Sequence, residues 1–101
     1  MISRLWRGRA ETTTANAYCR HFTETVVPAL KTLAGHRGAW LLRRDADGYA
    51  EFLVITLWES RQSIEAFAGA NVDVAIIEPE ARAVLSDFDD FARHYEVAFR
   101  S

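Results

Sequence analysis

The sequence predicts an α+β fold whose elements follow the order strand, helix, strand, strand, helix, strand. Three observations lead to this prediction. Apolar and polar residues alternate over residues 2–9, which is typical of a strand. Apolar residues then recur every four positions from Tyr18 to Leu30, which is typical of a helix face. Two further apolar runs, residues 36–44 and 49–58, flank the turn-forming sequence Asp-Ala-Asp-Gly and predict a hairpin.

The first helix is expected from about Ala15 to Leu33. The preceding cluster Thr12–Thr14 supplies hydroxyls that can cap the free N–H groups of a first turn. Pro28 lacks an N–H group, so it should kink the helix or split off its last turn. Gly35 is placed to end the helix. The apolar residues that share one face are Tyr18, Phe22, Val26, Leu30 and Leu33.

The second half of the chain begins with a short helix that Ser60 caps and Gly69 closes. Asn71 is expected to begin another helical stretch, which Pro79 interrupts. Pro79 can itself open a further turn that runs to about Leu85. The last element, residues 91–99, alternates and predicts a final strand.

This order is that of the ferredoxin-like βαββαβ plait, in one domain over residues 1–101. We expect a sheet that is antiparallel except for one central parallel pair, with the helices on one face. The third strand is apolar on both faces, whereas a sheet with one wet face should alternate. A homodimer is the simplest cover for the open face, and the alternative is a strand with some exposed aliphatics. The residues expected at this interface are Leu53, Ile55 and Leu57.

Composition excludes several classes of protein. Half of the residues are hydrophobic, which excludes a disordered chain. No apolar run reaches the roughly 18 residues of a membrane-spanning helix. The net charge is −2, and the arginines form only small groups, so we expect no nucleic-acid binding. Cys19 is the single cysteine, which excludes an internal disulfide and gives no zinc site. The N-terminus lacks a secretory apolar core, so the expected location is cytoplasmic.

The chain resembles the antibiotic biosynthesis monooxygenase family, whose members are dimeric ferredoxin-like α/β barrels. The similar stretches are MISRLWRG, GHRGAWLLRR, EFLVITLWES, IEAFAGANVDVA and HYEVAF. The family includes cofactor-independent quinol oxygenases, haem-degrading enzymes and many small proteins of unassigned activity, and this chain is most similar to the last group. Because a fold does not establish a function, the site is considered separately.

Two known constellations of the family can be compared position by position. The haem-degrading branch combines an Asn, a Trp and a His, and the matching positions here carry Trp6, Phe67 and Ile77. Ile77 cannot bind iron, so we do not expect haem degradation. The quinol-oxidising branch has an Asn four residues before a Trp. Trp58 matches that Trp, but Val54 stands at the Asn position and cannot donate a hydrogen bond to an oxyanion.

A pocket is expected between the sheet and its helices. By the period of the strands, Val54 and Trp58 face it, with Arg4 and Trp6 on the neighbouring strand. Phe67 of the short helix is added by its matching position in the family. Trp58 is either a flat wall for an aromatic ligand or simply part of the core.

His94 is the best acid–base candidate, because histidine titrates near neutral pH. The alternative is a strand-end histidine bonded to backbone or to an aspartate. Glu96 shares the face of His94 and either orients it or pairs with Arg4, which can otherwise bind an anionic group of a substrate. We interpret His21, on the polar side of the first helix, and His36, at a helix end, as structural.

The leading functional hypothesis is a cofactor-independent monooxygenase that acts on an aromatic, quinol or polyketide-like molecule. In this hypothesis His94 is the base, Arg4 contacts an anion, and no metal or other cofactor takes part. The alternative is a non-catalytic dimer of the same fold that binds a small ligand or is purely structural. The valine at position 54 favours the alternative, whereas the resemblance over the whole chain favours the enzyme.

Overall fold

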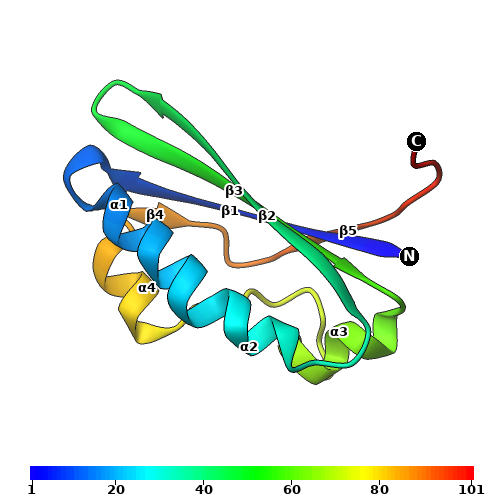
Figure 1. The fold of residues 1–101 in the computed structure, drawn as a ribbon. Coiled ribbons are helices and arrows are strands. Elements are labelled where there is room, and N and C mark those ends of the chain that lie inside the picture. Colours follow the sequence, from blue (N-terminus) through cyan, green and yellow to red (C-terminus); the bar gives the residue numbers. More distant parts are fainter.

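A computed structural model describes residues 1–101 (Figure 1). One antiparallel sheet carries all the helices on one face, and its other face has no helix over it. None of the helices has both the length and the apolar character needed to cross a membrane. The elements in chain order are β1 (Ile2–Glu11), α1 (Thr12–His21), η1 (Phe22–Val26), α2 (Val27–Lys31), β2 (His36–Ala46), β3 (Tyr49–Trp58), α3 (Arg61–Ala68), α4 (Pro79–Val84), β4 (Asp87–Phe88) and β5 (Arg93–Glu96).

The sheet has the strand order β2-β3-β1, with β4 and β5 both pairing the far edge of β1. The predicted ferredoxin-like α+β fold is therefore confirmed. The expected central parallel pair is wrong, because every pairing is antiparallel. Each helical crossover joins two strands that have a third strand between them, so the parallel strands are never neighbours.

The central hairpin forms as the sequence predicts. Ala46 pairs with Tyr49, which leaves Asp47 and Gly48 as a two-residue turn with φ of 55° and 79°. Two positive φ angles give a turn whose twist matches that of the flanking strands. Gly adopts such an angle freely and Asp does so more readily than most residues.

The first helical segment has a π turn in its middle. The Val27 N–H donates to the Phe22 carbonyl, five residues back, and α2 then begins at Val27 beside Pro28. In an α-helix four residues turn the chain by about 400°, so each four-residue step moves the side chain about 40° around the axis. The wider π turn takes up this drift and keeps Phe22 and Leu30 buried. Pro28 thus splits off a last turn, as expected.

The cap of this helix differs from the prediction. The helix begins at Thr12, its N-cap is Glu11, and no side chain caps it. The Thr14 hydroxyl donates instead to the carbonyls of Glu11 and, at 2.9 Å, Val84. The hydroxyl therefore ties α1 to the end of α4.

The second half of the chain contains one correction. Ser60 caps α3 by accepting from the Ser63 N–H, and α4 begins at Pro79, as predicted. The expected helical stretch from Asn71 is wrong. Its backbone pairs elsewhere, with Ala75 N–H donating to the Asp90 carbonyl and Ala92 N–H to that of Asp73. The final strand is also shorter than residues 91–99 and is preceded by the separate strand β4.

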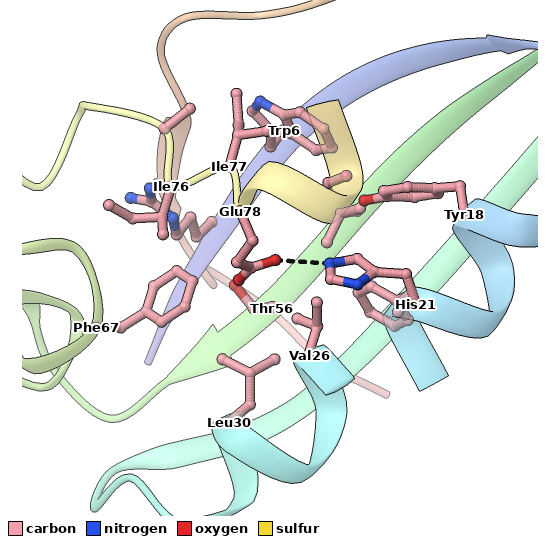
Figure 2. A pocket seen from close by; sticks show the side chains of 15 residues that line it. Trp6, Tyr18, His21, Val26, Leu30, Thr56, Phe67, Ile76, Ile77 and Glu78 are labelled. Atoms are coloured by element: carbon pink, nitrogen blue, oxygen red, sulfur yellow. Dashed lines mark hydrogen bonds and ion pairs between the residues drawn. The ribbon is translucent and has the colours of Figure 1, made fainter. Parts of the chain in front are cut away.

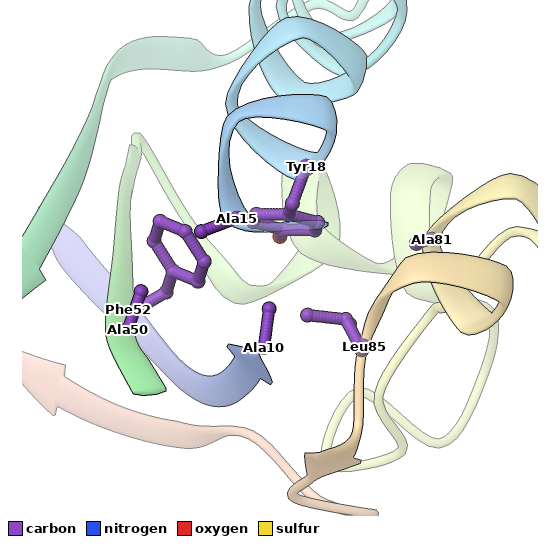
Figure 3. Packing of buried hydrophobic residues seen from close by; sticks show 7 residues of the cluster. All are labelled: Ala10, Ala15, Tyr18, Ala50, Phe52, Ala81 and Leu85. Carbon is purple, nitrogen blue, oxygen red and sulfur yellow. The ribbon is translucent and has the colours of Figure 1, made fainter. Parts of the chain in front are cut away.

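The buried core lies between the sheet and the helices in two clusters. The first contains several alanines that bring α1 and α4 close to β1 and β3 (Figure 3), namely Ala10, Ala15, Tyr18, Ala50, Phe52, Ala81 and Leu85. The second contains Leu30, Trp58, Ile64 and Val72.

The open face of the sheet is apolar. Trp40 and Leu42 of β2 are 45% and 46% exposed, beside Ile55 and Leu53 of β3. The chain itself covers one end of this face, because Val97 and Phe99 line a shallow groove there with Leu57. The rest of this face, at Trp40 and Leu42, stays exposed in the single chain.

Candidate functional site

A narrow, mainly apolar cavity lies between the sheet, the first helical segment and the loop before α4 (Figure 2). Its volume is about 60 Å³, and 11 of its 15 lining residues are hydrophobic. Four of the hydrophobic residues are aromatic, namely Trp6, Tyr18, Phe22 and Phe67. The polar lining residues are Arg4, His21, Thr56 and Glu78. Aromatic walls favour a flat ligand, but a volume of about 60 Å³ is far below the roughly 300 Å³ of a typical ligand site, so the lining side chains must move apart to admit a ring.

The floor of the cavity comes from the pairing of β1 with β3. Arg4 lies opposite Thr56, and Trp6 lies opposite Val54. Because alternate residues of a strand point to the same face, all four side chains reach the helical side of the sheet. Gly8 leaves room for the Trp6 ring, since a Cβ atom there would lie 2.9 Å from it.

His21 and Glu78 form a pair at the wall of the cavity. The His21 Nε2 atom lies 2.7 Å from Glu78 Oε2, and only 8% of the histidine side chain is exposed. An ionised carboxylate only accepts hydrogen bonds, so Nε2 carries the proton and Nδ1 is left with its lone pair. Nδ1 has no hydrogen-bond partner in the protein. This arrangement is that of an oriented histidine base.

Tyr18 adds a hydroxyl to the cavity. The residue is 4% exposed, and the centre of its ring lies 4.8 Å from that of Phe52. Figure 2 shows its oxygen pointing toward the cavity. Burial, with the nearby charge of Glu78, raises the pKa of this hydroxyl above its ordinary value. Tyr18 therefore stays protonated at neutral pH and can donate a hydrogen bond to a ligand.

The structure brings together four of the residues predicted for substrate binding. Arg4, Trp6, Val54 and Phe67 all line the cavity. Ile77, at the position of the histidine in the haem-degrading branch, lines it too. The residues compared with the two family constellations thus surround this one cavity, with the exception of Trp58.

The other predicted site residues lie outside the cavity. Trp58 is fully buried in the second core cluster, and its indole N–H donates to Thr56 Oγ1 at 2.9 Å. Glu96 is exposed and pairs in register with Ile2, so it neither orients His94 nor contacts Arg4.

His94 lies behind Arg4 and not in the cavity lining. Arg4 Nη1 is 2.9 Å from His94 Nε2, and His94 Nδ1 is 3.2 Å from Asp73 Oδ1. An arginine only donates, so Nε2 accepts and the proton is on Nδ1. Burial and the positive charge of Arg4 lower the pKa of His94 below its ordinary value. Both of its nitrogens are thus engaged in the neutral state.

The His21–Glu78 pair is the part of the site that the sequence analysis missed. His21 was assigned to the polar side of its helix, although it follows the buried Tyr18 by three residues and therefore lies near the same face. That spacing was an available signal for His21. Glu78 is 57 residues away in the chain, and only the fold brings it to the histidine.

The comparisons with known proteins agree with this architecture. A family model described as antibiotic biosynthesis monooxygenase matches residues 1–83. The chain belongs to the antibiotic biosynthesis monooxygenase family. The resemblance noted in the sequence is therefore confirmed. Members of this family are in general monooxygenases. Among curated proteins, none matches the sequence.

Two solved structures share the fold of this chain. A Bacillus cereus protein, itself assigned only provisionally to the antibiotic biosynthesis monooxygenases, has a TM-score of 0.68 at 17% identity, over 99% of this chain and 93% of that one. The haem degrader MhuD of Mycobacterium tuberculosis, with two haems in its active site, has a TM-score of 0.63 at 19% identity, over 100% and 99%. At these identities the likeness concerns the fold alone.

Metal binding finds no support in the side chains of the site. Nowhere in the chain do three His, Cys, Asp or Glu side chains come together in a group that could hold a metal ion. The single imidazole of the cavity, His21, is hydrogen-bonded to Glu78 through Nε2.

Proposed function

We propose that this chain is a cofactor-independent monooxygenase that oxidises a small phenolic aromatic molecule with O₂. The observation that carries the proposal is the His21–Glu78 pair in an apolar cavity with aromatic walls. Family membership supports oxygenase chemistry, and the pair supplies a base for a phenol. His21 takes the place of His94 as the base, because both nitrogens of His94 are engaged with Arg4 and Asp73.

The reaction balances without an added reductant. His21 Nδ1 takes the proton of the phenol, and the electron-rich ring of the phenolate then transfers electrons to O₂. One oxygen atom bonds to the ring carbon opposite the hydroxyl, and that carbon loses its hydrogen. The second oxygen atom leaves as water, so phenol and O₂ give quinone and water. The ring supplies all four electrons that O₂ accepts.

Two other polar groups of the cavity stabilise the charges that form when the phenol loses its proton. The negative charge of Glu78 stabilises the imidazolium that forms on His21. The Tyr18 hydroxyl, kept protonated by burial, donates to the substrate oxygen as charge develops there. This donor replaces the one that Val54 cannot provide. The aromatic walls exclude water from the reactive anion.

We also propose that the chain works as a homodimer through the open face of its sheet. This face exposes Trp40 and Leu42 beside Leu53 and Ile55. A contiguous apolar surface of this kind is typical of an interface. A two-fold axis places the same surface of a second copy against it.

The test is O₂ consumption with a panel of naphthols and quinols, combined with ¹⁸O₂ labelling. We expect a naphthoquinone with one labelled oxygen atom, and a loss of about 10²- to 10⁴-fold in kcat for His21→Ala. The matched control is Arg20→Ala, an exposed neighbour on α1, which should retain full activity. The proposal is wrong if no phenol consumes O₂, or if His21→Ala retains the wild-type rate. Tight binding of naphthols without oxidation would support the non-catalytic alternative.

A further inference from the structure

Arg4 is a buried cation without an anionic partner. The residue is 5% exposed. Its guanidinium donates to the carbonyl of Val72, to the carbonyl of Val74 at 2.9 Å and to the His94 imidazole. All three acceptors are neutral. A buried charge in a protein is normally paired directly with an opposite charge, whereas the carboxylate of Asp73 reaches Arg4 only through His94.

Part of the guanidinium remains free to bind an anionic group directly. An arginine has five N–H donors, and the three hydrogen bonds above use two nitrogens, Nη1 and Nη2. Nε has no partner in the protein. Nε is also not fully buried, because the only fully buried side-chain N or O atom without a partner is His36 Nδ1. Arg4 lines the cavity but not the groove beyond His94, so a ligand in the cavity lies against this side chain.

The surroundings of Arg4 fix its position. The side chains of His94 and Arg4 lie opposite each other on β5 and β1. His94 in turn contacts Asp73, which lies on the same loop as the two carbonyls that Arg4 binds. The hydrogen-bond series Asp73–His94–Arg4 therefore fixes the guanidinium on one side. The carbonyls of the loop fix it on another. A donor held rigidly in this way loses little entropy when it binds a ligand.

We propose that the substrate is an aryl carboxylate, with its carboxylate bound by Arg4 and its ring beside Phe67, and that His94 and Asp73 are positioning residues for Arg4. The Arg4 Cζ atom lies 5.7 Å from the centre of the Phe67 ring, so an aromatic wall adjoins the cation. A guanidinium matches the geometry of a carboxylate. The proposal deepens the proposed function, since the phenolic end of the same molecule would lie at His21.

The experiment measures binding, without turnover, of 2-naphthoate and of its neutral analogue 2-naphthamide by isothermal titration calorimetry. Neither probe has a hydroxyl to oxidise. We expect the folded wild-type protein to prefer the carboxylate by about 10- to 100-fold, as charge-assisted hydrogen bonds allow. Arg4→Met should remove this preference. The control Arg7→Met, on the same strand but with a 58% exposed side chain, should keep it.

His94 variants test the positioning role and replace Arg4→Met if that variant does not fold. Glutamine can accept from Arg4 and donate to Asp73, so His94→Gln should keep most of the preference. Leucine can do neither, so His94→Leu should lose it. Equal binding of the two probes to the wild type would overturn the carboxylate site at Arg4. Equal preference in the glutamine and leucine variants would overturn the positioning role of His94.

The failure of the inference and the failure of the proposed function give different results. A preference for the carboxylate without O₂ consumption by any hydroxynaphthoate leaves the inference standing and removes the oxygenase function. Oxidation of neutral naphthols with the same kcat/KM as hydroxynaphthoates leaves the oxygenase function standing and removes the carboxylate site.

Discussion

Replacing Glu78 by glutamine tests how much the carboxylate contributes to the proposed base. The variant Glu78→Gln keeps the size of the side chain and an oxygen that can accept from His21 Nε2, but it removes the negative charge. The charge matters most when His21 becomes an imidazolium, which happens only after it has taken the proton from the substrate. The variant should therefore lower kcat more than it raises KM.

The size of the effect follows from the geometry of the pair. The two groups are joined by a 2.7 Å contact, so their charges are centred about 4 Å apart. Two unit charges at about 4 Å interact by about 4 kcal/mol at an effective dielectric constant of about 20. The Glu78 side chain is 36% exposed, so solvent screening reduces this value to about 1.5–2.5 kcal/mol. That range corresponds to a loss of about 10- to 70-fold in kcat.

The assay is initial-rate O₂ uptake at pH 7.5 with a saturating naphthol that the wild type oxidises, with circular dichroism to show that each variant is folded. The control is Glu80→Gln, which removes an exposed carboxylate from the first turn of α4, two residues after Glu78, the N-cap residue of that helix. A kcat of Glu78→Gln within twofold of the wild type would refute the reasoning. An equal loss in Glu80→Gln would show that the net charge of α4 matters, and not the contact with His21.

Three further predictions concern stability and assembly. Trp58→Phe should lower the free energy of unfolding by about 1–2 kcal/mol, since it removes the hydrogen bond to Thr56 and leaves space in the core. A double-mutant cycle with Thr56→Val in urea should give a coupling of about 1 kcal/mol. The pKa of His94 and of His36 is lowered by burial from the ordinary value of 6.5. The unfolded chain then binds more protons, so the free energy of unfolding should fall as the pH drops below about 6.5, as urea titrations at pH 5 and pH 7.5 will measure. Trp40→Glu should convert a dimer to a monomer in native mass spectrometry.

Each of these predictions can be contradicted. A coupling near zero would mean that the Trp58 indole finds another partner. An unchanged pH dependence in His94→Gln would remove that histidine as a source of the effect. A wild-type protein that is monomeric at micromolar concentration would exclude the proposed interface.

Local patterns in the sequence predicted the elements that depend on local contacts. The alternation in β1 and the turn at Asp47–Gly48 are encoded within a few residues, and both formed as expected. The face of the first helix also followed from its spacing, because the π turn keeps four-residue steps in line.

Long-range contacts account for what the sequence did not indicate. The segment after Asn71 is extended because the carbonyls of Val72 and Val74 accept from Arg4. In addition, Ala75 N–H donates to the Asp90 carbonyl, and the Asp73 carbonyl accepts from Ala92 N–H. Val72, Val74 and Ile76 alternate, so a signal for extended backbone was present and was read as helix. The pairing of His21 with Glu78 had no local signal, because the two residues meet only after the second crossover of the chain is in place.

The π turn at Phe22–Val26 also makes this point of the first helical segment tolerant of deletion. Removal of one residue here would restore continuous α-helical winding, and four α-helical steps of about 100° bring the chain round to nearly the position that the wider turn reaches in five steps. His21 would therefore keep its place beside Glu78, and Leu30 would stay in the second core cluster. Removal of one residue elsewhere in the segment would instead rotate one half by about 100° relative to the other. Natural variants that lose a residue from this segment should lose it at the π turn.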